Sequence, residues 1–233
     1  MSEPNCKNCD KPLPGHACFC PACGQSVKGI SRPWLEFVHE ALSELFDYDG
    51  RMLLSMRLLL TRPGFLSYEY INGLRVSYTS PFRMYLVISL VFFYVLPLIL
   101  PDTPLDTSDH KVSVDLYSKA MFLMLPLFAL LLKIFYWRTF YVAHLVFAVY
   151  LFSAMFIVFA VMLSIETLAD RYVIMMLLQV AVLLYMVVYF VAALHTNYQE
   201  GWSKSALKSL ALLLIFVPVL IVIIELTRRQ GIT

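Results

Sequence analysis

Five cysteines lie within the first 23 residues of the chain, and four of them have the spacing of metal ligands. Cys6 and Cys9 form one C-x-x-C pair, and Cys20 and Cys23 form a second pair. A C-x-x-C pair is a tight turn that brings two thiolates to one ion, so the two pairs predict a tetrahedral four-thiolate site for Zn²⁺. Because the protein would fill all four ligand positions, we expect a structural site rather than a catalytic one.

Residues 1–30 are therefore predicted to form a small zinc ribbon. A segment this short cannot bury enough apolar surface to fold alone, so the metal would supply the folding free energy, on the order of 10 kcal/mol. Cys18 and His16 are alternative ligands, but C-x-C spacing suits a tetrahedral pair less well. A redox dithiol is a further alternative for either pair, although no βαβ pattern surrounds them.

The composition of the whole chain indicates an integral membrane protein. Of its 233 residues, 60% are hydrophobic and 15% are charged, with a mean hydropathy of +0.74. A soluble domain has about 45–50% apolar and about 25% charged residues. The net charge of +2 argues against a nucleic-acid partner, because such binding relies on a strongly basic surface.

Residues 31–80 are predicted to form amphipathic juxtamembrane linker helices. One begins at Pro33, with an apolar face opposite an acidic one. A second covers 51–61 and is too short to cross a bilayer, which takes about 20 residues. We expect this second helix to lie in the interface or to pack under the bundle. A third covers 65–72 and ends at Gly73, a residue suited to the position after a helix.

Residues 81–227 are predicted to form a transmembrane bundle. The apolar segments that could span are 81–100, 116–136, 140–163, 172–194 and 206–226, with a polar loop over 195–204 before the last. The fold class is thus an all-α polytopic membrane protein of about five transmembrane helices. Lys and Arg in the flanking segments place the N-terminus in the cytoplasm. With five spans Arg228 and Arg229 would lie outside, against this charge rule, so a re-entrant last segment or an interfacial helix that counts as a sixth span remains an alternative.

Several short motifs occur together along most of the chain. They are Cys6-x-Asn8-Cys9, Cys20-x-x-Cys23-Gly24-Gln25, the pair Asp47 and Asp49, Arg62-Pro63-Gly64, Tyr70-Ile71-x-Gly73-x-Arg75-x-x-Tyr78-x-x-Pro81, and His144-Leu145-x-Phe147-Ala148. In this combination the chain resembles a family of bacterial inner-membrane proteins, a domain of unknown function with an N-terminal zinc ribbon. The resemblance implies a multi-span protein of that membrane, and it brings no reaction, substrate or catalytic residue.

Two non-enzymatic functions fit these features. In the first, the protein anchors a zinc ribbon at the membrane, where the ribbon docks a cytoplasmic or membrane protein. In the second, a polar cluster binds an anionic lipid headgroup at the cytoplasmic face, because the planar fork of arginine fits phosphate. The candidates for this cluster are Asp47, Asp49, Arg51, Arg62, Arg75, Tyr78 and Arg83. The alternative is that the two aspartates pair internally with arginines and hold the linker together.

An intramembrane enzyme centred on His144 is a third hypothesis. An ionisable residue within a span is a functional candidate by default, and His144 could bond Tyr141 or Glu166 in the bundle interior. The same histidine could instead lie at the membrane interface in a structural role. Because no H-E-x-x-H, G-x-S-x-G or P-loop pattern is present, the sequence favours a protein without enzymatic activity.

Overall fold

The structure is a computed structural model that describes residues 5–14, 17–25, 27, 51–99, 123–169 and 173–230. Over these residues the chain forms helices and no extended strand, with an isolated antiparallel bridge between Asn5 and Pro12 near the N-terminus. The helices are α2 (Arg51–Thr61), α3 (Phe65–Asn72), α4 (Pro81–Ile99), an unlabelled helix over Leu123–Phe135, α6 (Tyr141–Ala169), α7 (Val173–Tyr198) and α8 (Trp202–Gln230). The all-helical fold class is confirmed. The predicted helix from Pro33 lies outside the described residues.

Three of the helices, α6, α7 and α8, are long and apolar enough to cross a membrane. Over their described residues, α4 and the helix before α6 are apolar but shorter. The predicted polar loop over 195–204 is mostly helical, since α7 continues to Tyr198 and α8 begins at Trp202. The turn between them is closed by His195, whose Nδ1 lies 2.5 Å from the carbonyl oxygen of Glu200 and whose ring stacks on Trp202.

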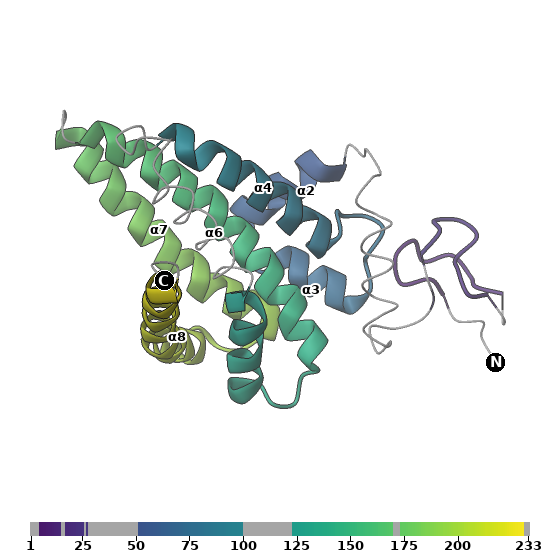
Figure 1. The fold of residues 1–233 in the computed structure, drawn as a ribbon. Coiled ribbons are helices and arrows are strands. Elements are labelled where there is room, and N and C mark those ends of the chain that lie inside the picture. Colours follow the sequence, from purple (N-terminus) through teal and green to yellow (C-terminus); the bar gives the residue numbers. More distant parts are fainter. Residues whose placement is uncertain are drawn as a thin grey trace.

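Helix α6 is the centre of the bundle. Figure 1 shows α4, α6 and α7 lying side by side along one direction, whereas α8 is seen almost end-on. Of the most apolar window of α6, 61% is buried, against 11% for α7 and for α8. Ala148 and Ala154 are fully buried on α6, and small residues let membrane helices approach closely. In the part of the chain that the structure describes, the outward faces of α7 and α8 are therefore exposed.

Helices α2 and α3 pack against α6 and α7. The hydroxyl groups of Tyr189 and Tyr185 on α7 donate to the carbonyl oxygens of Leu59 and Leu60, each at 2.7 Å. These carbonyls belong to the last turn of α2, where backbone acceptors have no partner within the helix. The bounds of α2 and α3 coincide with the predicted 51–61 and 65–72.

Side chains from four helices form three successive layers inside the bundle. The aromatic layer is Phe128, Phe152, Phe190 and Phe216, the aliphatic layer is Leu132, Ala148, Leu194 and Leu212, and the polar layer is Tyr136, His144, Tyr198 and Lys208. From one layer to the next, the residue number in each segment changes by four, which corresponds to about one helical turn or ~6 Å. All four members of the aliphatic layer have an exposed fraction of 0%. It therefore separates the aromatic layer from the polar layer.

Candidate metal centre and the linker that holds it

The two C-x-x-C pairs form two knuckles with the same backbone pattern. In the first, the N–H of Cys6 donates to the carbonyl of Lys11, and the carbonyl of Cys6 accepts from Asp10. In the second, Cys20 makes the corresponding bonds with Gln25 and Gly24. The residue after each pair has a left-handed backbone, with φ of 57° at Asp10 and 72° at Gly24. Glycine adopts this conformation without strain, and aspartate is among the few other residues that tolerate it.

The four thiols of the knuckles converge into one group that could hold a metal ion. All four Sγ atoms lie within 4.8 Å of one another, with 3.7 Å between Cys6 and Cys23 and 3.6 Å between Cys9 and Cys20. These separations are far longer than a disulfide bond of about 2.05 Å, and the cysteines are free thiols. Cys18 is exposed and lies outside the group, while His16 lies outside the described residues.

The thiols of this group differ in acidity. Hydrogen bonds from the backbone of Ala22 and Cys23 stabilise the thiolate of Cys20 and lower its pKa to about 6. At Cys9, a backbone hydrogen bond from Lys11 acts in the same direction, but burial and the neighbouring thiols outweigh it and raise the pKa to about 12. Of Cys9 and Cys20 in the metal-free group, Cys20 therefore loses its proton first. A bound cation would favour the thiolate form at all four positions.

The ribbon is joined to the segment that follows α3. The side-chain amide of Gln25, next to the second knuckle, donates to the carbonyl oxygen of Gly73. The same amide accepts from the backbone N–H of Arg75 at 3.2 Å. On the first knuckle, the side chain of Asn8 accepts from the hydroxyl of Ser77 at 2.8 Å. Both knuckles thus contact residues 73–80, which we call the linker strap.

The linker strap also forms hydrogen bonds with α2 and α6. Its backbone N–H at Thr79 donates to the hydroxyl of Ser55 on α2 at 3.0 Å. The carbonyl oxygen of Thr79 accepts from the hydroxyl of Tyr150 on α6 at 2.8 Å. The guanidinium of Arg51 donates to the carbonyl oxygen of Val76. Since one short segment bonds both the ribbon and the bundle, the metal centre is held against the membrane domain.

The predicted headgroup cluster is distributed among separate contacts. Arg62 is exposed and lies over the ring of Phe65, with 5.6 Å between the guanidinium carbon and the ring centroid. Arg75 lies over the ring of Tyr70 at 5.8 Å.

The ring of Tyr78 packs edge-on against Phe65, with 5.9 Å between the centroids. Arg83 is half-buried near the start of α4, and Asp47 and Asp49 lie outside the described residues.

His144 is fully buried in the polar layer, where both ring nitrogens have partners. Its Nε2 lies 3.2 Å from the carbonyl oxygen of Tyr136, which can only accept, so Nε2 carries the proton. Nδ1 is then free to accept from the hydroxyl of Tyr198, at 2.7 Å. The expected bond to Tyr141 is not formed, because that hydroxyl donates to the carbonyl of Pro126 instead. The side chain of Glu166 lies outside the described residues.

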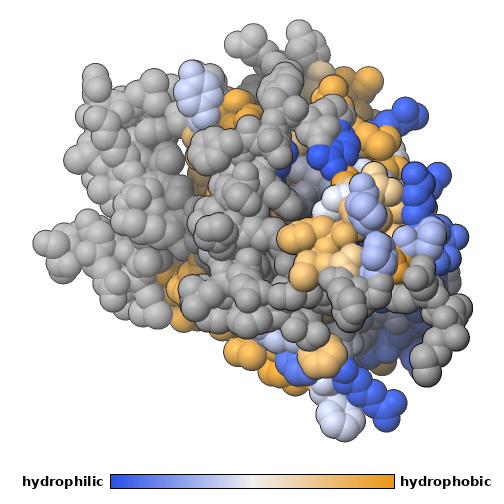
Figure 2. Space-filling model, turned by 90° about the vertical axis from the view of Figure 1, so that its right-hand side faces the viewer, coloured by the Kyte–Doolittle hydropathy of each residue, from blue (hydrophilic) through white to orange (hydrophobic). Residues whose placement is uncertain are grey.

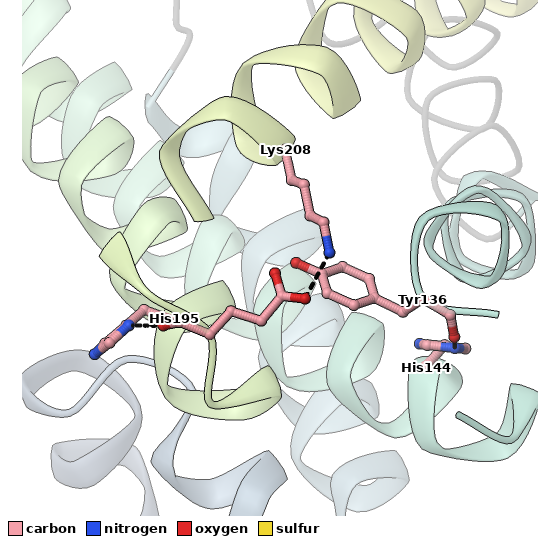
Figure 3. Close-up of polar contacts among 5 residues, drawn as sticks. Tyr136, His144, His195 and Lys208 are labelled. Atoms are coloured by element: carbon pink, nitrogen blue, oxygen red, sulfur yellow. Dashed lines mark hydrogen bonds and ion pairs between the residues drawn. The ribbon is translucent and has the colours of Figure 1, made fainter. Parts of the chain in front are cut away.

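The polar layer also includes residues that the sequence analysis missed. Tyr136 stacks on Tyr198 with 3.6 Å between centroids and an interplanar angle of 7°. On its other face, Nζ of Lys208 lies 3.9 Å from the ring centroid and forms a 2.7 Å ion pair with Glu200 (Figure 3). Lys208 could have indicated this layer from the sequence, because it lies within the predicted span 206–226 and an ionisable residue inside a span needs a partner.

Comparison with known proteins gives one match. A family model described as "Protein of unknown function (DUF3667)" matches residues 49–93, which include α2, α3, the linker strap and the start of α4. No curated protein and no solved structure matches the chain. The segment that bonds the ribbon to the bundle is thus the part of this chain that is similar to a family of unknown function.

Proposed function

We propose that this protein is a non-enzymatic, membrane-anchored docking protein whose zinc ribbon presents a binding surface to a protein partner. The observation that carries the proposal is the attachment of the ribbon to the linker strap through Gln25 and Asn8. A ribbon on a free tether could take many orientations. A ribbon bonded to the bundle keeps one surface directed away from the membrane domain, and such preorganisation lowers the entropic cost of binding.

The choice of zinc is supported by the geometry of the thiol group. A tetrahedral site with Zn–S bonds of about 2.3 Å has S–S edges of about 3.8 Å. The separations of 3.7 Å for Cys6 and Cys23 and 3.6 Å for Cys9 and Cys20 are close to that edge. Four thiolates are soft ligands that favour zinc over magnesium or calcium. A closed set of four protein ligands would stabilise the ribbon and leave no position for a substrate.

The partner surface that we propose is centred on Phe19. This side chain is 61% exposed, although it belongs to a ribbon whose described residues form a small buried cluster of Cys6, Leu13 and Cys20. Exposed aromatic side chains on a rigid support are the usual anchors of protein interfaces. Figure 2 looks at the side of the molecule that carries the ribbon, where hydrophilic and hydrophobic residues are mixed over the coloured part of the face. A mixed surface suits a soluble protein segment better than the bilayer interior.

The location that fits this proposal is the cytoplasmic face of a bacterial inner membrane. Free thiols persist in a reducing compartment, and a zinc thiolate site is stable there. Lys133, Arg138, Lys204 and Lys208 lie at the same end of the bundle as the polar layer, and basic residues favour the cytoplasmic side. The partner would then be a cytoplasmic protein or the cytoplasmic part of a membrane protein.

The proposal can be tested by photo-crosslinking in the membranes of the native host. A photoreactive phenylalanine analogue is placed at position 19, and in a second variant at position 57, because Arg57 is also exposed but belongs to α2. We expect one discrete protein adduct from position 19 that is absent from position 57 and is lost when Cys20→Ser removes a ligand. Adducts of equal yield from both positions, or adducts with lipid alone, would overturn the proposal.

A further inference from the structure

An apolar groove lies between the helix Leu123–Phe135, α6, α7 and α8. Its volume is about 340 Å³, and every residue that lines it is Phe, Leu, Met or Val. The floor includes Phe128 and Phe216 of the aromatic layer, whose ring centroids are 4.9 Å apart. In Figure 1, α7 lies along the picture and α8 is seen nearly end-on, so the two helices diverge from the short turn that joins them.

The groove is closed toward the polar layer. Leu132, Leu194 and Leu212 stand one helical turn from the groove residues Phe128, Phe190 and Phe216, and all three leucines have an exposed fraction of 0%.

A polar solute at the end of the bundle would have to pass this buried layer. Among the residues that the structure describes, those that line the groove have only apolar side chains, and burying an unpaired polar group is costly. These two features exclude a water-soluble ligand entering from that end.

The side walls of the groove face outward. Val187 on α7 and Val217 on α8 line it, and their exposed fractions are 55% and 42%. Both residues belong to helices that are long and apolar enough to cross a membrane. The medium beside these walls is therefore hydrocarbon, and lipid is the molecule present there at the highest concentration.

The depth of the groove matches the acyl chains of one leaflet. His144 and Phe152 are eight residues apart on α6, so the aromatic layer lies about 12 Å from the polar layer. Half of a hydrocarbon core is about 15 Å thick. If the polar layer lies near the headgroups, the groove lies at the depth of the chains of that same leaflet.

We propose that the groove binds an acyl chain of a bilayer phospholipid, as a specific lipid site of this protein. The chain enters laterally between α7 and α8, packs on the rings of the aromatic layer and leaves its headgroup toward the end of the bundle that holds Lys208. Lining methionines such as Met155 and Met186 adapt to an irregular chain, since their thioether side chains are flexible. This site is independent of the docking surface at Phe19.

The test is native mass spectrometry of the detergent-extracted full chain, which counts phospholipids retained per protein. Val187→Phe places a ring in the groove, whereas Val188→Phe adds the same ring at a neighbouring residue that is 63% exposed and does not line it. We expect the wild type and Val188→Phe to retain one phospholipid per chain and Val187→Phe to retain at least tenfold less.

A second pair of variants tests the groove independently if Val187→Phe fails to fold. Val217→Phe fills the opposite wall, and Leu214→Phe is its control at a residue that is 67% exposed and outside the groove. The proposal is overturned if the wild type retains no phospholipid, or if groove and control variants lose it equally. A spectrum in which two copies of the chain associate without lipid, and separate when Val187 or Val217 is replaced, would assign the groove to self-association and overturn it as well.

Discussion

The side-chain amide nitrogen of Gln25 donates a hydrogen bond to the carbonyl oxygen of Gly73, 48 residues further along the chain. Gln25 is buried, with an exposed fraction of 6%, and its amide oxygen accepts from Arg75. One side chain of the ribbon thus satisfies two backbone groups of the linker strap. The structure thereby couples a metal site of about 20 residues to a membrane bundle that begins more than 50 residues later.

Replacing Gln25 by alanine should loosen the ribbon without removing its metal. The variant leaves the carbonyl of Gly73 and the N–H of Arg75 without the side-chain partner, at a cost of roughly 1–3 kcal/mol. We expect faster proteolysis between the ribbon and α2 and an unchanged ratio of metal to protein. Gln199→Ala is the control, because Gln199 is exposed and bonds only the nearby carbonyl of Thr196. Equal proteolysis of both variants would contradict the role of Gln25.

Cys20→Ser should abolish metal binding and leave the membrane helices folded. Cys20 supplies one of the four converging thiols, whereas Cys18 is exposed and outside the group. Elemental analysis of the purified protein should find about one metal ion per chain for the wild type and Cys18→Ser, and none for Cys20→Ser. Circular dichroism should show the same helix content in all three. Loss of the whole protein from the membrane in Cys20→Ser would contradict a separate ribbon.

Gly64→Ala should destabilise the packing of α3 on α7. Gly64 has a φ of 75°, and an added Cβ would clash with the backbone of Ala193. The left-handed backbone alone costs about 1 kcal/mol for alanine, and a fixed backbone contact adds to it. Thermal unfolding in detergent should show a lower midpoint than for Gly201→Ala, whose Cβ would meet nothing within 4 Å. Equal unfolding midpoints for Gly64→Ala and Gly201→Ala would contradict a close approach between Gly64 and α7.

Lys208→Met should be more destabilising than an ordinary surface substitution. Its ion pair with Glu200 is only about one-quarter exposed, with side-chain fractions of 25% and 26%, and its Nζ covers the ring of Tyr136. Loss of both contacts should cost roughly 1–3 kcal/mol, between the values for exposed and buried pairs. The double variant with Glu200→Gln should cost less than the sum of the two single variants. Strict additivity would indicate that the pair contributes nothing.

Local features of this fold could be predicted from the sequence, whereas long-range contacts could not. The knuckles follow from the C-x-x-C spacing. Helix α2 ends directly before Arg62-Pro63-Gly64, and α3 ends directly before Gly73, as these residues predict. The partners of His144 were missed because Tyr136 follows the helix Leu123–Phe135 and Tyr198 ends α7, and no local pattern fixes the register between helices. The length of α8 was underestimated because its polar first turn was read as a loop.

The contact between ribbon and strap was missed for the same physical reason. Gln25 and Arg75 were both recognised as parts of motifs, but a motif does not state which distant backbone group its side chain will bond. The arginines were grouped by proximity in sequence, while in the structure Arg62 and Arg75 lie over different aromatic rings. Spacing along the chain predicted the metal group well, because its ligands lie in two local turns.

Hydrogen exchange at two amides of the linker strap tests the central claim most directly. The N–H of Arg75 bonds the ribbon through Gln25, whereas the N–H of Thr79 bonds Ser55 in α2. If the metal holds the ribbon on the strap, a chelator should speed exchange at Arg75 by at least tenfold and leave Thr79 unchanged. Unchanged exchange at both amides after complete metal removal would contradict a metal-dependent attachment of the ribbon to the membrane domain.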